Sequence, residues 1–412
     1  MRILIVTNHF WPENFRINDL AVGFKELGHE ITVYTGIPDY PDGRFYSGYG
    51  LFRKRVDNYN GIKVIRYPLI PRGKGKAWNL VLNYLSSAIM SSILAPFYCR
   101  DRFDIIFVFE TSPVTIGLPA IIVKKLQSIP LILWVLDLWP ESLSATGAIE
   151  SPSILSIAKR MVRFIYGHSD RILVSSEGFV ESIRAISPES LIEYFPNWVE
   201  PEYAEAIKPE PAQALDALPA MPEGFKVMFA GNIGAAQDFE TILQAAQKLK
   251  AHTDIQWIIL GDGRRADWVR AQVKALGLVQ QFHLLGRFPA EQMPAFFSLA
   301  DALLMTLKRE PIFALTAPGK LQSYLAAGKP VIAGIDGEGA RIVKQAGAGL
   351  TCPAENADEL AARIMELYRM SSEERTKMGE RGRAYCAEHF NRNYLFTKLE
   401  TLMKDVIETR NG

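Results

Sequence analysis

The stretch FAGNIGAAQDFETI, residues 229–242, places an apolar strand, a turn with two glycines and an amphipathic helix in direct succession. A strand–turn–helix unit of this kind often binds a phosphate through the free N–H groups at the start of the helix. The turn lacks the lysine of G-x-x-x-x-G-K-[ST] and does not match the dinucleotide spacing G-x-G-x-x-G. A phosphate held by Gly231, Asn232 and Gly234 would therefore need positive charge from elsewhere, and a plain turn is the alternative.

Short apolar runs alternate with helical patterns on both sides of this unit. They are residues 2–7, 30–35, 62–67, 104–109, 131–136 and 171–176, and then 226–231, 255–261, 282–286, 302–307, 330–334 and 348–352. Continuous rather than alternating apolar runs are typical of strands buried on both faces of a parallel sheet. The sequence therefore predicts an α/β fold with two Rossmann-like, doubly wound parallel-sheet domains that face a cleft, where ligands bind at the carboxyl ends of the strands.

The length of 412 residues favours two domains. A segment rich in Pro, Ala and Glu, residues 201–224, is the predicted linker. It separates an N-terminal domain, residues 1–200, from a C-terminal domain, residues 225–371. Residues 372–412 have helical patterns, and we expect these helices to pack back on the N-terminal domain.

Charge and cysteine content bear on partners and compartment. The net charge of +1 argues against a nucleic-acid partner. Cys99, Cys352 and Cys386 lie far apart and form neither a disulfide framework nor a metal motif, which suits a cytoplasmic protein. The sequence has no D-x-D loop and no His/Cys cluster, so we expect no metal and no cofactor.

A basic run precedes one long apolar segment. Apart from Asp57, the charged residues between 44 and 76 are Arg44, Arg53, Lys54, Arg55, Lys63, Arg66, Arg72, Lys74 and Lys76. The segment 77–99 follows, and it is long enough to span a bilayer, at about 20 residues, but contains asparagines and serines. This order is typical of a helix on an anionic membrane surface, and the predicted contacts are Arg53, Lys54, Arg55, Lys74, Lys76 and Trp78. A buried helix behind solvated loops is the first alternative, and a helix that spans the bilayer is the second.

The stretch PGKLQSYLAAGKPVIA, residues 318–333, offers a cation for the phosphate. Gly319 and Lys320 stand at the start of a predicted helix, where a lysine opposes the helix dipole. A bound anion would explain a lysine at this place, because the ammonium group and the helix-start amides would both pair with it. An exposed first-turn lysine is the alternative.

The stretch VLDLWPES, residues 135–142, presents acidic groups after a buried strand. Asp137 follows the strand, and Glu141 opens the next helix after a proline. An acid at this edge could orient or deprotonate an acceptor hydroxyl, so both are candidate catalytic residues. Simple capping is the alternative for Glu141. His9, at the end of the first strand, either lines the cleft or is a satisfied loop histidine.

These stretches, together with WVLDLWPES (134–142) and FPNWVE (195–200), are similar to those of the retaining glycosyltransferases of family 4, which have the GT-B fold. The chain most resembles bacterial O-antigen and capsule transferases for L-fucosamine (N-acetyl-L-fucosamine). The resemblance extends over nearly the whole chain in family order. It also shows departures: Asn232 and Gln237 stand where family members commonly have an Arg and a Lys, and Leu315 and Ser323 stand at the two positions of the usual Glu pair.

The resemblance implies an acceptor-binding N-terminal domain and a C-terminal domain that binds a nucleotide sugar. Its donor would be a UDP-sugar, and its acceptor a lipid-diphosphate-linked saccharide at the inner face of the plasma membrane. The predicted nucleotide-sugar contacts are Arg16, Gly231, Asn232, Gly234, Arg287, Phe288, Lys308 or its neighbour Arg309, Gly319, Lys320, Ser323 and Glu338. A UDP-sugar epimerase of the same fold and a non-catalytic nucleotide-sugar binder are the alternatives.

Overall fold

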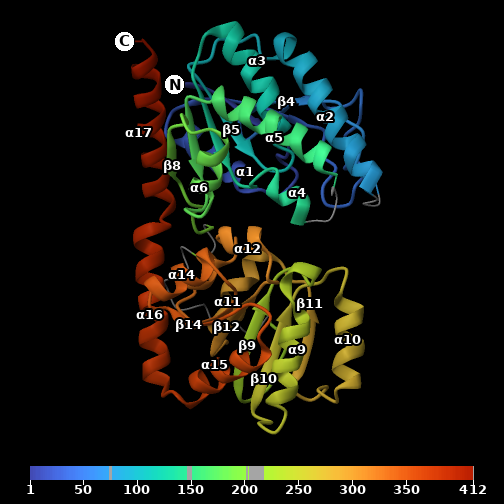
Figure 1. The fold of residues 1–412 in the computed structure, drawn as a ribbon, viewed down its shortest axis with the longest axis vertical. Coiled ribbons are helices and arrows are strands. Elements are labelled where there is room, and N and C mark those ends of the chain that lie inside the picture. The colour runs from blue at the N-terminus through green and yellow to red at the C-terminus, as the bar shows by residue number, and fades with distance from the viewer. Residues whose placement is uncertain (74–76, 146–150, 201–202, 204–217, 412) are drawn as a thin grey trace. The chain divides into compact units, whose positions relative to one another are not determined.

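The computed structural model of the chain describes residues 1–73, 77–145, 151–200, 203 and 218–411 (Figure 1). Lys74, Lys76 and most of the expected linker lie outside these residues. The chain divides into an N-terminal unit, Met1–Pro196 with Leu395–Gly412, and a C-terminal unit, Asn197–Tyr394. The first boundary thus falls a few residues before the predicted one.

The N-terminal unit is built on an eight-stranded sheet in the order β3-β4-β2-β1-β5-β6-β7-β8. Its strands are β1 (Arg2–Thr7), β2 (Glu30–Gly36), β3 (Val56–Tyr59), β4 (Ile62–Tyr67), β5 (Ile105–Glu110), β6 (Leu131–Val135), β7 (Arg171–Val174) and β8 (Ile192–Tyr194). All pairs are parallel except β3 with β4. The six predicted strands are present, and the sequence analysis missed the two edge strands, β3 and β8.

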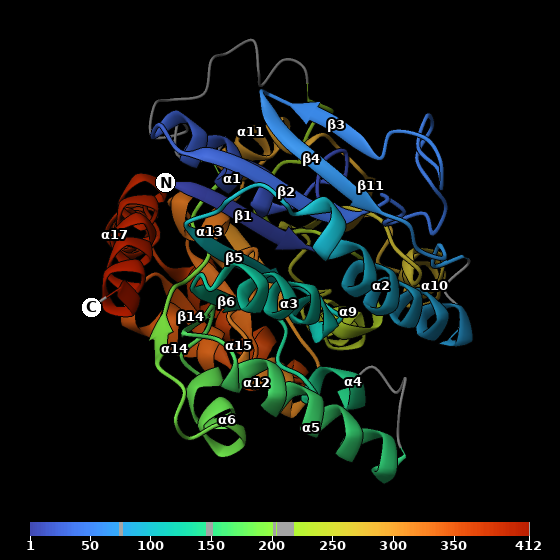
Figure 2. The same cartoon turned by 90° about the horizontal axis from the view of Figure 1, so that it is seen from above.

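Helices cover this sheet and connect its strands: α1 (Arg16–Glu26), α2 (Ala77–Tyr98), η1 (Val114–Ile116), α3 (Gly117–Gln127), α4 (Glu141–Ala145), α5 (Pro152–Gly167) and α6 (Phe179–Ile186). Helices α2 and α3 lie side by side (Figure 2). The last helix, α17 (Arg392–Asn411), returns to this unit, where Lys398 donates to the carbonyl of Tyr194 at 3.0 Å. Residues 395–411 therefore pack on the N-terminal unit, as expected.

The C-terminal unit has a six-stranded, wholly parallel sheet in the order β11-β10-β9-β12-β13-β14. The strands are β9 (Phe225–Ala230), β10 (Ile255–Leu260), β11 (Phe282–Gly286), β12 (Ala302–Thr306), β13 (Val331–Gly334) and β14 (Gly349–Cys352). All six were predicted to within one residue at each end. The order reverses between β9 and β12, which is the switch point at which doubly wound sheets bind ligands, outside the carboxyl ends of the strands.

Both faces of this second sheet are covered, which explains the continuous apolar runs. Val227 and Phe229 belong to one buried cluster and Met228 to the other. The helices are η3 (Ala235–Gln237), α9 (Phe239–Lys248), α10 (Ala266–Ala275), η4 (Ala290–Gln292), α11 (Met293–Ser298), α12 (Pro311–Leu315), α13 (Leu321–Ala326), α14 (Glu338–Gln345), α15 (Ala357–Arg369) and α16 (Ser372–His389).

The structure corrects the expectation for α16. This helix belongs to the C-terminal unit, where it packs against α13. Gly379 lets the helix approach the turn at Gly328 so closely that a Cβ on Gly379 would lie 2.0 Å from the carbonyl oxygen of Gly328. Arg383 then donates to the carbonyl of Ala327 at 3.1 Å. Only the last helix returns to the N-terminal unit.

Candidate functional site

Two glycine turns meet at the switch point of the C-terminal unit. The first, Gly231 to Gly234, follows β9, and the second, Gly261 to Gly263, follows β10. Gly261 has a φ of +134°, and a Cβ on it would lie 1.8 Å from the carbonyl oxygen of Gly231. Glycine is needed here because the two backbones are in contact. The side chain of Asn232 packs against Gly234: a Cβ on Gly234 would lie only 2.5 Å from Nδ2 of Asn232.

The first turn does not offer its amides as expected. The N–H of Gly231 donates to the carbonyl of Leu260 at 2.9 Å, and that of Ile233 to the carbonyl of Asp262 at 2.8 Å. The N–H of Gly234 donates to the side chain of Gln237 at 3.1 Å. Three of the four amides of the GNIG turn therefore have acceptors within the unit, which corrects the prediction that they present free donors to a diphosphate.

Lys320 joins this turn from a distant part of the sequence. Its Nζ lies 3.8 Å from the ring centroid of Phe229 and would lie 3.0 Å from a Cβ on Gly231. Although the residue as a whole is partly exposed, Nζ itself is shielded from solvent and has no hydrogen-bond partner among the described residues. Burial lowers the pKa of Lys320 to about 7.

An amine in this position is suited to bind an anion. Without a carboxylate to pair with, the ammonium form is costly to bury, which is why the pKa falls. A phosphate oxygen that reached Nζ would restore the charge and form a charge-assisted hydrogen bond. The two stretches that the sequence analysis selected, 229–242 and 318–333, thus meet at one nitrogen atom.

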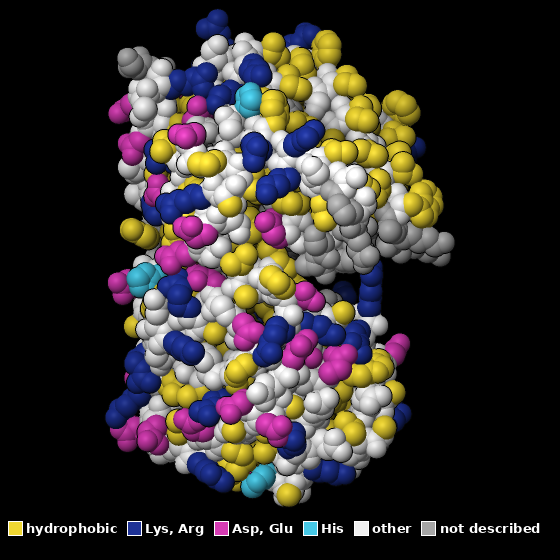
Figure 3. All heavy atoms as spheres, viewed as in Figure 1, with side chains coloured by type: hydrophobic (Ala, Val, Ile, Leu, Met, Phe, Trp, Pro, Cys, Tyr) yellow, Lys and Arg dark blue, Asp and Glu magenta, His cyan; other side chains and the backbone are white. Residues whose placement is uncertain are grey.

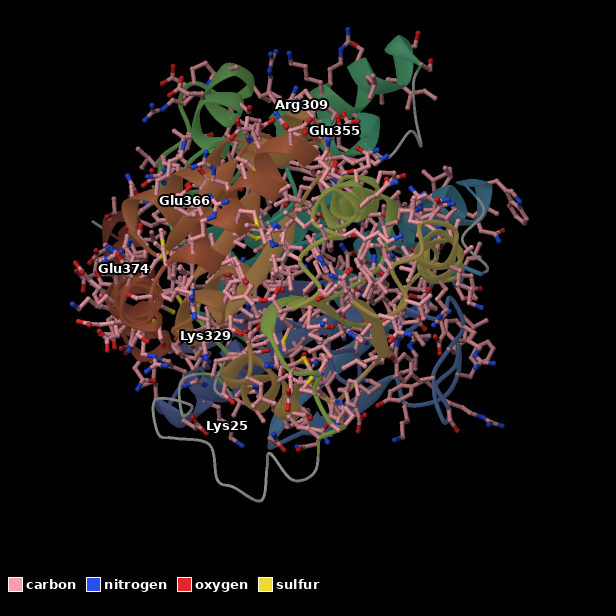
Figure 4. All side chains as sticks on the ribbon, turned by 90° about the horizontal axis from the view of Figure 1, so that it is seen from below. Lys25, Arg309, Lys329, Glu355, Glu366 and Glu374 are labelled. Carbon is pink, nitrogen blue, oxygen red and sulfur yellow. The ribbon has the colours of Figure 1, made fainter. Side chains whose placement is uncertain are left out.

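The other basic candidates are less available. Arg309 donates from Nη2 to the carbonyl of Ala354 at 2.7 Å and from Nε to Asp336 at 3.2 Å, and it lies beside the turn that carries Glu355 (Figure 4). Lys308 is partly buried on the same loop after β12. Arg287 is largely exposed after β11, and its Nε lies 4.0 Å from Asp262.

Three remaining candidates of the C-terminal unit are held by neighbouring side chains. Ser323, at one position of the family's Glu pair, is buried and donates to the carboxylate of Glu200 at 2.8 Å. Glu200 is thus a carboxylate near this position that the sequence analysis did not select. Glu338, the first residue of α14, accepts from Arg341 Nε at 2.7 Å and from Nη2 at 2.6 Å. The ring of Phe288 packs against another ring, that of Phe296, at 4.6 Å.

Gly319 lies in the turn that leads into α13, next to Lys320. Helix α13 has only six residues. The N–H of its first residue, Leu321, already has an acceptor, because it donates to the carbonyl of Pro318. Arg16 differs from the other candidates because it belongs to the N-terminal unit, as the first residue of α1.

In the N-terminal unit, the predicted acids lie beside a buried carboxyl group that the sequence analysis missed. Asp137, after β6, accepts from the N–H of Ser112 at 3.0 Å. Glu110 ends β5, is fully buried, and neither oxygen of its carboxyl group has a hydrogen-bond partner with good geometry among the residues that the structure describes. Burial raises the pKa of Glu110 well above its usual value, and the charge of Asp137 raises it further.

Two more polar groups belong to this cluster. Burial raises the pKa of Glu141, and its Oε2 has no hydrogen-bond partner within the described part of the chain. The buried hydroxyl of Tyr166 also lacks a hydrogen-bond partner among these described residues, and the charges of Glu110 and Glu141 add to burial in raising the pKa of Tyr166. The signal for Glu110 was present in the sequence, because an acidic residue directly after an apolar run is the same pattern that selected Asp137.

A second polar cluster surrounds His9, after β1. His9 Nδ1 lies 2.8 Å from Glu13 Oε2, and Arg72 Nη2 lies 3.1 Å from His9 Nε2. Asp39, after β2, accepts from the N–H of Arg72 at 2.7 Å. Both ring nitrogens of His9 therefore have partners, which favours the satisfied-histidine interpretation. We call these four residues the His9 cluster.

Helix α2 is inverted relative to an ordinary surface helix. Its polar side chains Asn83, Ser87 and Ser91 are buried. Its exposed side chains are the large apolar ones, Trp78, Val81, Leu82, Leu85, Ile89, Ile93 and Phe97, and Figure 3 shows apolar side chains gathered over this helix. The stretch Trp78–Tyr98 is long and apolar enough to cross a membrane, but only 22% of its most apolar window is buried. The structure thus contradicts the buried-helix alternative.

The basic residues before α2 differ in their surroundings. Arg55 donates from Nε to the carbonyl of Arg66 at 2.8 Å and from Nη2 to the hydroxyl of Tyr98 at 2.9 Å. Lys54 is exposed, with Nζ 5.1 Å from the ring centroid of Tyr49, and Arg53 is exposed as well. Arg55 is therefore part of the fold, while Arg53 and Lys54 face solvent.

Comparison with known proteins matches each unit to a family of glycosyl transferase domains. Residues 14–198 match the family described as glycosyl transferase 4-like domain, and residues 216–385 match the family described as glycosyl transferases group 1. The glycosyltransferase WbjE of Pseudomonas aeruginosa is 29% identical over 57% of this chain, and the match covers 59% of WbjE, less than two thirds of its length. The colanic acid biosynthesis glycosyl transferase WcaI of Escherichia coli K12 is 24% identical over 80% of this chain and 82% of WcaI.

A solved structure supports the same fold. HepE from Anabaena, determined in complex with UDP, superposes with a TM-score of 0.70 and 14% identity over 98% of this chain and 100% of HepE. The two family matches together cover most of the chain. The two units therefore match two families of glycosyl transferase domains, and the two parallel-sheet domains are those of the GT-B fold.

Proposed function

We propose that this protein transfers a sugar from a UDP-sugar to a lipid-diphosphate-linked saccharide in the synthesis of a bacterial surface polysaccharide. The proposed sugar is an N-acetylated deoxyhexose such as N-acetyl-L-fucosamine, and the proposed stereochemical outcome is retention. The reaction would take place in the cytoplasm, at the inner face of the plasma membrane.

The buried amine of Lys320 at the switch point is the observation that supports this proposal most. A sugar nucleotide carries a diphosphate, and an anion is the partner that this nitrogen lacks. The UDP in the HepE complex shows that a protein of this fold binds that nucleotide. The name of WcaI, a colanic acid transferase, supports a polysaccharide product.

The proposed chemistry follows from the charges. As the bond from the sugar to the diphosphate breaks, negative charge develops on the leaving UDP, and a positioned cation stabilises that charge. Lys320 would supply it. Asp137, at the carboxyl end of β6, would orient or deprotonate the acceptor hydroxyl. Metal independence remains a prediction, and transfer in the presence of a chelator tests it.

The test measures UDP binding and sugar transfer separately. Lys320→Met preserves much of the side-chain volume but removes the amine, and we expect at least a tenfold loss of UDP affinity, the size of one charge-assisted contact. Lys274→Met, on the exposed face of α10, is the control. Isomerised donor in place of a transfer product would instead support an epimerase. Binding without reaction would support a non-catalytic binder, and unchanged UDP affinity in Lys320→Met would remove the lysine from the site.

A further inference from the structure

An apolar cavity of about 580 Å³ lies against α2 in the N-terminal unit. Its walls come from three segments: the loop that carries Leu51 and Phe52, the segment after β4 that carries Ile70, and the face of α2 that carries Met90, Leu94 and Tyr98. Small-molecule sites in proteins typically have volumes of about 300–1,000 Å³. The cavity is therefore large enough to be a binding site.

The lining selects a hydrocarbon ligand. Among the described residues that line the cavity, Arg55 is the only one with a charged side chain, and its guanidinium is engaged with the carbonyl of Leu51 at 3.2 Å and the hydroxyl of Tyr98 at 2.9 Å. It fixes the loop across the cavity instead of offering free donors to a ligand. The side chain of Phe52 is 94% exposed, beside the apolar cavity. Exposure of an aromatic ring to water is unfavourable, so an apolar ligand that covered the ring would be stabilised by its burial.

Hydrogen bonds of Asn83 connect the cavity wall to the polar edge of the sheet. Asn83 Nδ2 donates to the carbonyl of Ile70, in the cavity wall, at 2.7 Å, and lies 3.2 Å from Oδ2 of Asp39 in the His9 cluster. Arg72 follows the wall segment directly. The apolar wall thus leads directly to a cationic side chain, whose Nη2 lies 3.1 Å from His9 Nε2 and whose Nε is buried and has no hydrogen-bond partner in the described part of the chain.

We propose that this cavity holds the first isoprenoid units of the lipid-linked acceptor, with the diphosphate of that lipid at Arg72 and the acceptor sugar beyond it. This inference rests on the proposed function, and it assigns the acceptor's tail to a site in the protein. The exposed stripe of α2 continues from the cavity along the helix, which lets the rest of the chain remain in the bilayer. A charged head beside an apolar cavity matches an isoprenyl diphosphate better than a free sugar or a free phosphate.

Photolabelling tests the site without requiring sugar transfer. The probe is geranylgeranyl diphosphate with a photoreactive group at the end of its chain, and the labelled residues are mapped by mass spectrometry on the full-length protein. We expect labels on the peptides that carry Phe52, Met90 or Leu94. Unlabelled geranylgeranyl diphosphate should compete, whereas inorganic diphosphate and phosphatidylglycerol should not. Competition by phosphatidylglycerol at the same concentration would overturn the assignment to the acceptor lipid.

Matched variants locate the label. Leu94→Trp fills the cavity. We expect about tenfold weaker labelling, because a few methylene groups of the probe can then no longer be buried there. Ile93→Trp, one residue away on the exposed stripe, should label like the unchanged protein. If Leu94→Trp lowers the melting temperature, Met90→Trp fills the same cavity from another position. Equal labelling in the filled and unfilled proteins would overturn the proposal.

The outcome separates this inference from the proposed function. Correct labelling without any sugar transfer would leave the cavity as a lipid site and refute the transferase. If Leu94→Trp and the unchanged protein have the same KM for a long-chain lipid acceptor, the cavity does not bind the isoprenoid chain of that acceptor. We expect the KM for a long-chain acceptor to rise about tenfold in Leu94→Trp, and that for a water-soluble short-chain acceptor to stay constant.

Discussion

The Nζ atom of Lys320 lies 3.0 Å from the point where a Cβ on Gly231 would stand. The lysine comes from the turn before α13 and the glycine from the turn after β9, so nearly ninety residues of sequence separate them. Gly231 has a φ of +140°, which other residues rarely adopt. The glycine is therefore required twice: for the path of its own backbone and for the space that the amine occupies.

Gly231→Ala should weaken UDP binding. The added methyl group would displace Nζ from its position above Phe229, and the strained φ costs about 1–3 kcal/mol of stability. We expect at least a tenfold rise in the Kd for UDP by calorimetry, together with a lower urea midpoint. Gly167→Ala is the control, because a Cβ there meets nothing within 4 Å. Unchanged UDP affinity in Gly231→Ala would contradict the site.

The titration of Lys320 makes a second prediction. The pKa of Lys320 is about 7 in the free protein, and a bound diphosphate raises it. Below pH 7 the amine is protonated in both states, so the affinity for UDP is constant. Above pH 7 the free protein has lost the proton that the complex keeps, and binding takes up a proton. Affinity should then fall by up to about tenfold per pH unit.

Calorimetry in buffers of different ionisation enthalpy measures that proton directly. At pH 8 we expect close to one proton taken up per UDP bound by the unchanged protein, and none by Lys320→Met. Working between pH 7.5 and 9 avoids the last ionisation of the nucleotide itself, at about pH 6. Equal uptake by the two proteins would show that another group titrates.

The sequence predicted the fold well because burial on both faces leaves a local signal. All twelve predicted strands exist, since continuous apolar runs do not depend on distant partners. The two missed strands have no such signal. Strand β3 has the sequence VDNY and forms an antiparallel edge, and β8 has three partly buried residues. Their pairing depends on neighbours that the local sequence does not reveal.

The site was harder to predict because its chemistry depends on tertiary contacts. The sequence analysis chose Lys320 because a lysine at the start of a helix opposes the helix dipole. Only the structure shows that its amine lies over the ring of Phe229, beside Gly231. The amides of the GNIG turn were expected to be free, but Leu260, Asp262 and Gln237 accept from them. These acceptors come from other segments or from a local side-chain turn, so the motif alone could not show that its donors are engaged.

Glu110 should make the stability of the protein depend on pH. Its pKa is raised in the folded state above the ordinary value of 4.5, so the folded protein holds a proton that the unfolded chain releases. The stability contributed by this group therefore falls as pH rises from about 4.5 through the folded-state pKa, by up to about 1.4 kcal/mol per unit. Glu110→Gln has no such proton and should lose this slope.

Urea unfolding of both proteins at pH 5 and pH 8 checks this prediction. Glu110→Gln should gain stability relative to the unchanged protein as pH rises. Parallel curves for the two proteins would mean that Glu110 is ionised in the fold, with partners other than those described.

Asp137→Asn separates a structural from a catalytic role. The amide oxygen of asparagine still accepts from the N–H of Ser112, so the local fold should persist. The basicity of the carboxylate is lost, and we expect turnover to fall by about 10²-fold or more with little change in the Kd for UDP. Full activity in this variant would limit Asp137 to supporting the turn at Ser112, and the acid would have to be sought elsewhere.

The inverted helix α2 predicts how the protein meets a membrane. Its large apolar side chains are exposed over several turns, which water disfavours and lipid does not. Ile93→Asp should reduce binding to anionic vesicles in a flotation assay by at least tenfold. Leu191→Asp introduces the same change at another exposed apolar position, beside the edge strand β8, and should bind normally.

Neutralising Arg53 and Lys54 should weaken vesicle binding most at low salt, because exposed charges act within a Debye length of about 10 Å at 0.1 M. Arg55 is left intact, since it holds the loop to Tyr98. If Ile93→Asp and Leu191→Asp bind vesicles equally well, the exposed stripe of α2 does not face lipid, and its inversion must serve a protein partner instead.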